Sequence, residues 1–258
     1  AGRIGGKEKP KCTLRIYNLP LDDMQVLTTL AFDPLAVKKN RLVLMAGDAN
    51  GMTQVFAGDI TSAVPRFAAD ASSVFEVEAV TGYVASVTPV APLTAEGAQD
   101  VSTLLRGLAG QMGFTYIDRG VSVTVRNVAL VGGPMEQARQ LADAARIDLI
   151  LDDGEMIAAP RGELRRDDAE GSTPVLRDRT GLIGFPGFDA KGIVGKCLYE
   201  PRLVLGGPVR IESMVPKASG LWRVSSLSHR LQANHGNARA WETSFKATYP
   251  NAKKDAKK

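Results

Sequence analysis

The stretch from Leu198 to Tyr249 reads LYEPRLVLGGPVRIESMVPKASGLWRVSSLSHRLQANHGNARAWETSFKATY. Apolar and polar residues alternate through Leu221–Leu227 and again from Trp241 to Tyr249, which is typical of half-buried strands. Between these runs lie clusters of Gly, Pro and Asn, the residues of tight turns. The stretch therefore predicts short strands that close a small β-barrel without a reaction centre. Trp222 and Trp241 are expected at core or cross-strand positions of its wall.

A second β-rich stretch occupies residues 12–88. Residues 12–19, 41–46, 54–61 and 73–83 have strand patterns, and Gly47–Met52 contains the Asn-Gly signal of a hairpin loop. Between the first two strands, apolar residues recur every three positions from Pro20 to Leu30, which predicts a short helix. The two β-rich ends of the chain are thus of similar size, although no residue-level repeat relates them.

The pattern changes in the middle of the chain. Apolar stripes predict helices over Ala95–Met112 and Met135–Arg146, the second opened by a proline at its first position. Four short strands are expected at residues 114–117, 121–128, 147–151 and 155–159. The order αββαββ indicates a small α+β domain. The polar segment 161–173 lacks apolar periodicity and is interpreted as a linker or exposed loop.

The expected fold class is therefore α+β and mainly β, with two β-barrel domains separated by the αββαββ insert. The domain boundaries follow from the changes of pattern: 1–88, 89–172 (insert and linker), 173–250, and a basic flexible tail at 251–258.

Composition excludes several classes of protein. The net charge is +4, and four lysines lie in the last six residues, so there is no concentrated basic face for nucleic acid. Cys12 and Cys197 lack metal-ligand spacing and are expected to be reduced packing residues. No apolar run reaches the length of about 18 residues that a membrane anchor needs, and the sequence has no signal-peptide pattern. The chain begins without Met, which leaves open a trimmed N-terminus or an earlier strand.

Catalytic constellations are absent from the sequence. Ser228 and His229 are adjacent on a strand and point to opposite faces, so they cannot partner each other. Glycosidase chemistry needs two carboxyl groups converging at roughly 5–10 Å. The acidic doublets have simpler explanations at a helix start, a hairpin turn and a polar linker, and they lie at Asp22-Asp23, Asp152-Asp153 and Asp167-Asp168. We predict no catalytic residue, no cofactor and no metal site.

The motifs resemble those of phage tail baseplate hub proteins. The resemblance rests on Thr13–Leu19 (TLRIYNL), on Val55–Ile60 (VFAGDI), and on the run from Gly181 to the final Trp-x-Thr strand. Glu200-Pro201 stands where the family usually has Asn-Pro. The residues that carry the structural signature are Tyr17, Asn18, Gly47, Phe56, Gly58, Pro201, Gly206, Trp222 and Trp241.

The resemblance implies a structural role in the virion tail. Hubs of this kind are similar to the base of type VI secretion spikes, and each chain contributes two tube-like β-barrel domains. A homotrimer would form a pseudo-sixfold ring that joins the tail tube protein to the central spike protein and lets viral DNA pass. Baseplate wedge proteins are further possible partners. Barrel edges and the segments 1–11 and 161–173 are expected to make the contacts between subunits.

Two other classes stay open at this point. A carbohydrate- or nucleic-acid-binding β module would need an exposed aromatic row or salt-dependent affinity. A tail-associated cell-wall hydrolase would need a convergent acid and base.

Overall fold

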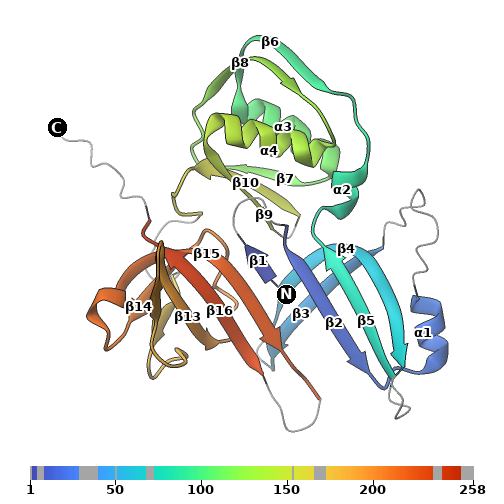
Figure 1. The fold of residues 1–258 in the computed structure, drawn as a ribbon, viewed down its shortest axis with the longest axis vertical. Coiled ribbons are helices and arrows are strands. Elements are labelled where there is room, and N and C mark those ends of the chain that lie inside the picture. Colours follow the sequence, from blue (N-terminus) through green and yellow to red (C-terminus); the bar gives the residue numbers. More distant parts are fainter. Residues whose placement is uncertain are drawn as a thin grey trace.

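The computed structural model describes residues 2–4, 9–28, 40–49, 51–67, 73–152, 154–165, 173–234 and 240–250. Two curled β half-barrels lie beside each other, and a smaller α/β part lies across one end of both (Figure 1). We call these parts the N-terminal half-sheet, the C-terminal half-sheet and the central part. The fold is thus mainly β with some helices.

The N-terminal half-sheet is antiparallel, with the strand order β2-β5-β4-β3. Its strands are β2 (Lys11–Tyr17), β3 (Arg41–Asp48), β4 (Gly51–Phe67) and β5 (Ser73–Val80). All four predicted strands are confirmed. The predicted hairpin is confirmed, but its loop is shorter than Gly47–Met52, because Gly47 pairs with Met52 and Asp48 pairs with Gly51.

The short helix predicted before β3 is confirmed as α1 (Leu21–Leu27), with Asp22 and Asp23 in its first turn. Carboxylates at this end of a helix complement the partial positive charge of the free backbone N–H groups. Only Met24 of α1 is buried, and it packs against the N-terminal half-sheet.

The C-terminal half-sheet contains the two strands on which the fold prediction rests. They are β15 (Gly220–Leu231) and β16 (Trp241–Thr248), and in β16 the buried side chains alternate with exposed ones. The other strands are β11 (Val175–Arg177), β12 (Gly187–Asp189), β13 (Gly192–Leu198) and β14 (Pro208–Glu212), and a 3-10 turn, η1 (Pro216–Ala218), precedes β15.

A short N-terminal strand, β1 (Gly2–Ile4), connects the two half-sheets. It pairs with β15 from Gly2 opposite Ser228 to Ile4 opposite Ser226, and with β2 where Gly2 lies opposite Lys11. The result is one 11-stranded sheet with β3 and β12 at its ends. Two separate barrels were expected; among the described residues, no pairing closes either half on itself. Segment 1–11 was expected to make contacts between subunits, but its residues 2–4 pair with strands of the same chain.

The central part contains β6 (Leu93–Asp100), α3 (Val101–Met112), β7 (Thr115–Asp118), β8 (Thr124–Leu130), α4 (Pro134–Ala145), β9 (Ile147–Asp152) and β10 (Glu155–Pro160). A five-residue helix, α2 (Tyr83–Val87), leads into it from β5. The order is βαββαββ rather than αββαββ, because the first third of the predicted helix belongs to β6. The helix starts at Val101, where the Asp100 side chain accepts the N–H of Thr103 and caps it.

The strands of the central part form two separate sheets. β7 and β8 form no hairpin: β7 pairs in parallel with β10, and β8 pairs antiparallel with β6. The predicted hairpin of β9 and β10 is confirmed. Helices α3 and α4 pack on these sheets around a core that includes Leu105, Leu141 and Met156.

The predicted domain boundaries at residues 88 and 172 stay predictions, and residues 251–258 lie outside the described part of the chain. No helix in the described ranges is long and apolar enough to span a membrane.

Candidate assembly surfaces

The nine signature residues are distributed over both half-sheets and form no single site. Phe56 is fully buried under the N-terminal half-sheet, and Trp222 is buried in the C-terminal core, where its indole N–H donates to the carbonyl of Ala218 (2.9 Å). Trp241 is half-buried, donates to the carbonyl of Gln232 (2.8 Å) and lies edge-on to Tyr199. These aromatic side chains serve packing within each half-sheet.

Three of the signature residues, Gly47, Gly58 and Asn18, occupy positions where the backbone geometry restricts the choice of side chain. A Cβ atom on Gly58 would lie 2.6 Å from the ring of Phe56, and one on Gly47 would lie 1.9 Å from a carbonyl oxygen of the paired strand. Neither position accepts a side chain without displacing its neighbours. Asn18 has φ +57°, a left-handed conformation that asparagine tolerates, and it ends β2.

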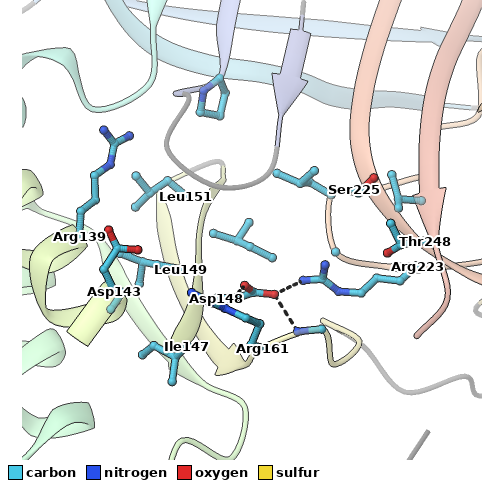
Figure 2. A pocket seen from close by; sticks show the side chains of 17 residues that line it. Arg139, Asp143, Ile147, Asp148, Leu149, Leu151, Arg161, Arg223, Ser225 and Thr248 are labelled. Atoms are coloured by element: carbon cyan, nitrogen blue, oxygen red, sulfur yellow. Dashed lines mark hydrogen bonds and ion pairs between the residues drawn. The ribbon is translucent and has the colours of Figure 1, made fainter. Parts of the chain in front are cut away.

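The central part and the C-terminal half-sheet both line a cavity of about 360 Å³ (Figure 2). We call the contact between them the joint. At this joint the carboxylate of Asp148 on β9 accepts hydrogen bonds from the guanidinium of Arg223 on β15 (2.8 Å) and from the N–H of Gly162 (3.0 Å). Arg223 also donates to the carbonyl of Glu163 (2.7 Å). One side chain of the half-sheet thus binds two segments of the central part.

A second contact at this joint was missed from the sequence. Arg165 lies in the segment interpreted as a linker, yet it is buried, and its guanidinium pairs with Asp152 and with Glu155 (3.4 Å). The backbone N–H of Arg165 donates to the carbonyl of Gly206 (2.7 Å). The described end of the linker is therefore not an exposed loop, and Asp152, expected in a hairpin turn, is a buried residue at the end of β9. No periodicity in the sequence signals this pair.

Gly206 is the signature residue at this contact. It has φ +76°, and a Cβ atom there would lie 2.5 Å from the side chain of Ile150 on β9. The left-handed backbone conformation favours glycine here, and a side chain would also have to displace the end of the Ile150 side chain. Pro201, by contrast, lies in an exposed turn.

Three strands of the large sheet pair on one side only, among the described residues: β3 with β4, β12 with β13, and β11 with β14. Exposed apolar side chains lie at two of these edges: Val43 and Met45 on β3, and Phe185 and Phe188 at or beside β12. An unpaired strand edge with apolar side chains is a template for pairing with another chain.

The candidate catalytic groups are not brought together. His229 is buried, and its Nδ1 lies 2.8 Å from the hydroxyl of Thr243, whereas Ser228 is exposed on the other face. Cys12 and Cys197 are buried free thiols, and burial raises the pKa of Cys197 to about 12. Within the described ranges, no three His, Cys, Asp or Glu residues are grouped as metal ligands.

Four residues considered above as catalytic candidates lie outside the described part of the chain: Asp153, Asp167, Asp168 and His235.

The sequence profile of the family described as "Baseplate hub gp41" matches residues 7–239. The chain belongs to this baseplate hub family. The resemblance inferred from the sequence motifs is thereby confirmed, and the chain is a structural component of a phage tail baseplate. No curated protein matches the hub chain.

Solved structures share the fold of this hub chain at low identity. The 43 kDa tail protein of prophage MuSo2 from Shewanella oneidensis has a TM-score of 0.64 at 10% identity, over 96% of the hub chain and 92% of its own. A tail protein from Neisseria meningitidis MC58 has a TM-score of 0.58 at 11% identity, over 80% and 86%.

A third structure comes from a secretion system. The E. coli c3393 protein, described as a type VI secretion component similar to the T4 tail proteins gp27 and gp5, has a TM-score of 0.61 at 12% identity. The match covers 98% of the hub chain and 77% of c3393. A hub family is structural, which argues against an enzymatic role; that this chain has none stays a prediction.

Proposed function

We propose that three copies of this chain form a ring with pseudo-sixfold symmetry, which joins the tail tube to the central spike. The observation that carries this proposal is that each chain holds two curled half-sheets in one continuous sheet. Two like-sized tube-like units per chain, taken three times, provide the six positions that a hexameric tube requires. In this way the ring connects the sixfold symmetry of the tube to the threefold symmetry of the spike.

The open strands β3 and β12 support closure of such a ring. They lie at opposite ends of the same sheet, so β3 of one copy can meet β12 of the next in a head-to-tail contact. Head-to-tail contacts form closed rings when the rotation between copies closes. Pairing would also cover Val43 and Phe188, which are 49% and 55% exposed in the single chain.

The ring model assigns the partners and the place of action. The tail tube protein would bind one face and the central spike protein the other, with baseplate wedge proteins at the periphery, in the virion tail. Viral DNA would cross the lumen during ejection without being bound. The similarity of c3393 to the T4 proteins gp27 and gp5 supports this arrangement by analogy.

A native mass measurement tests the ring. We expect an assembly of three times the 27.5 kDa chain, and a ring with a central lumen in electron micrographs. Val43→Lys places a charge on the open edge of β3 and should shift the protein toward monomers. Val131→Lys is the matched control, because Val131 is equally apolar and 61% exposed, but lies outside both edge strands. A chain that stays monomeric at high concentration, with no self-contacts in cross-linked tails, contradicts the model.

The binding-module and hydrolase alternatives have no specific observation in their favour. Release of peptidoglycan fragments by the purified hub would be evidence for the hydrolase alternative.

A further inference from the structure

The directions of the strands determine how the two open ends of the large sheet can meet. Among the described residues, the path from one end to the other contains an odd number of strands, in the order β12-β13-β16-β15-β1-β2-β5-β4-β3. All neighbours on this path are antiparallel, so β12 and β3 run in the same direction. Rotation about the axis of a ring preserves the direction of strands along its wall. In the ring proposed above, β3 of one copy and β12 of the next are therefore parallel.

Of the three residues of β12, only Phe188 presents its backbone groups at the open edge. On β13, the carbonyl of Lys196 and the N–H of Leu198 bond to the segment that precedes β12, so the even-numbered residues of β13 face that side. Gly187 and Asp189 lie opposite even-numbered residues of β13, and their N–H and C=O groups accordingly face β13. The N–H and C=O of Phe188, between these two residues, point away from β13.

The side chain of Phe188 lies on the core face of the sheet but is not covered there. Its opposite residue on β13 is Ile193, which is fully buried, and opposite residues of paired strands point to the same face. Phe188 is nevertheless 55% exposed. An apolar side chain therefore extends the C-terminal core to the open edge of the sheet.

On β3 the open edge presents the backbone groups of Val43 and Met45. The carbonyl of Asn40 accepts a backbone N–H of β4, so the even-numbered residues of β3 face β4 and the odd-numbered ones face the open edge. The side chains alternate in the same way. Val43 and Met45 are exposed on the outer face, whereas Leu44 packs on the core face against the small cluster that contains Phe56.

The core faces of the two half-sheets lie on the same side of the continuous sheet. Gly2 of β1 lies opposite both Lys11 of β2 and Ser228 of β15, and these two residues are exposed on the outer face. When β3 and β12 of successive copies meet in a ring, the core face of one half therefore continues into the core face of the other.

Parallel pairing restricts the residue that can lie opposite Phe188. In a parallel pair, a residue whose N–H and C=O face the partner strand lies opposite a residue whose groups face away from it. Phe188 therefore lies opposite an even-numbered residue of β3, whose side chain shares the core face. Leu44 is in the middle of β3, and this register also covers Val43 and Met45, which are 49% and 44% exposed.

We propose that β12 of each hub pairs in parallel with β3 of the next, with Phe188 opposite Leu44, and that the phenyl group of Phe188 extends the small core of that N-terminal half. The N–H of Phe188 would donate to the carbonyl of Val43, and its carbonyl would accept the N–H of Met45. A second hub is the matching occupant, because the direction and the core face of β12 agree with those of β3. This inference deepens the proposed ring and rests on it.

Photo-cross-linking tests the contact in the purified hub and in assembled tails. With benzoylphenylalanine in place of Phe188, we expect a product between two hubs, attached within residues 42–46 of the second copy. The same cross-linker in place of Ala190 tests the direction. Its attachment should shift toward Asp48 if the strands are parallel, and toward Arg41 if they are antiparallel.

Other outcomes of the cross-linking separate this inference from the ring model. In an assembly with the native mass of a trimer, four results overturn the inference and leave the ring intact: a product between two β12 strands, a product within one chain, a product with a different tail protein only, or no product. An antiparallel shift from Ala190 overturns it as well. A monomeric native mass contradicts the ring and the inference together.

Side-chain variants measure the contribution of the phenyl group. Phe188→Ala should raise the hub concentration at half-assembly about tenfold, because each contact loses an apolar side chain from its centre. Phe67→Ala is the matched control, because Phe67 is 65% exposed but lies on β4, which is not an edge strand, and it should leave assembly unchanged. Trp fluorescence spectra verify that both variants fold. Equal shifts in the two variants, or no shift in Phe188→Ala, overturn the proposal.

Discussion

The two half-sheets have the same curled architecture but very different cores. In the N-terminal half the buried apolar residues form two small clusters, around Phe75 and around Phe56. In the C-terminal half they form one large cluster that contains Trp222 and Phe245. Large apolar side chains are exposed on both halves, among the described residues: Tyr17, Leu21, Val26, Leu27, Val43, Met45, Met52 and Phe67 on the N-terminal half, and Ile183, Phe185, Phe188, Leu198, Met214 and Tyr249 on the C-terminal half. The smaller core of the N-terminal half is therefore the difference between them. We infer that the N-terminal half depends more on neighbouring proteins for its stability.

A shared packing device relates the two halves despite this difference. In each, a strand glycine lies against a phenylalanine ring: a Cβ on Gly58 would be 2.6 Å from Phe56, and one on Gly195 would be 2.4 Å from Phe245. In each, a second glycine packs against the carbonyl oxygen of the paired strand, at Gly47 and at Gly192. Curled sheets need such close approaches, because the strands bend over their own core.

The central part is attached unequally to the two halves. Toward the C-terminal half it has the Asp148–Arg223 bond and the buried Arg165. Toward the N-terminal half the contacts include α2, whose Val84 N–H donates to the Asp59 carboxylate (2.9 Å), and Lys9, which lies near Glu136 and Arg139 of α4. We expect the central part and the C-terminal half to unfold together.

The largest difference in the free energy of unfolding is expected when one large buried side chain is removed from each core in turn. Trp222→Ala should lower the free energy of unfolding by about 4–5 kcal/mol, since it removes a buried ring and an indole hydrogen bond. Phe56→Ala should cost about 3 kcal/mol, because its cluster is small and can collapse more easily. Both tryptophans lie in the C-terminal half, so fluorescence from Trp241 follows that half.

Hydrogen exchange in β5 follows the other half in the same denaturant series. If Phe56→Ala destabilised the protein more than Trp222→Ala, the inferred order of core stability would be wrong.

The strands of the half-sheets could be predicted because their faces alternate between core and solvent. β16 shows this directly: Thr243, Phe245 and Ala247 are buried and their neighbours are not. β6 could not be predicted, since its pattern has no clean period and Gly97, at φ +73°, interrupts it at an irregular pairing. Arg165 was missed for another reason: burial of a charged residue depends on a partner distant in the fold, which local pattern does not encode.

Removal of the Arg165 side chain tests the attachment of the central part. Arg165→Met should cost about 3 kcal/mol, because it removes the charged partner of a buried ion pair with Asp152. The loss should appear in both the central part and the C-terminal half, with β5 exchange unchanged. Arg161→Met is the matched control, because its side chain is 60% exposed and its contact with Asp148 is long, at 4.0 Å. Equal losses in the two variants would contradict a role for the buried pair.

The paired glycines allow a finer comparison of the two halves. Gly58→Ala should cost about 2–3 kcal/mol, because the new methyl group meets both the Phe56 ring and the backbone nitrogen of Thr81 at 2.9 Å. Gly195→Ala should cost about 1 kcal/mol, since its close neighbours all belong to the Phe245 ring, which can shift. Denaturant midpoints, read by β5 exchange and by Trp fluorescence, measure the two losses. The reverse order would show that the larger core is the more rigid one.

The smallest expected effect concerns the dependence of stability on pH. A hydrogen bond from Arg15, with a further one from Arg66, holds the pKa of Glu76 below its ordinary value, and Arg177 does the same for the pKa of Glu212. A carboxyl group with a lowered pKa in the folded state stabilises the protein above its unfolded pKa of about 4.3, and this contribution is lost as pH falls through the folded pKa. Glu76→Gln should therefore flatten the fall in stability of the N-terminal half below about pH 4.3, and Glu212→Gln that of the C-terminal half. The Glu76 change should be the greater because two arginines bind it and one binds Glu212. The Glu212 side chain is exposed and that of Glu76 is half-buried, so salt should weaken the Glu212 effect more, whereas the core and glycine differences should persist.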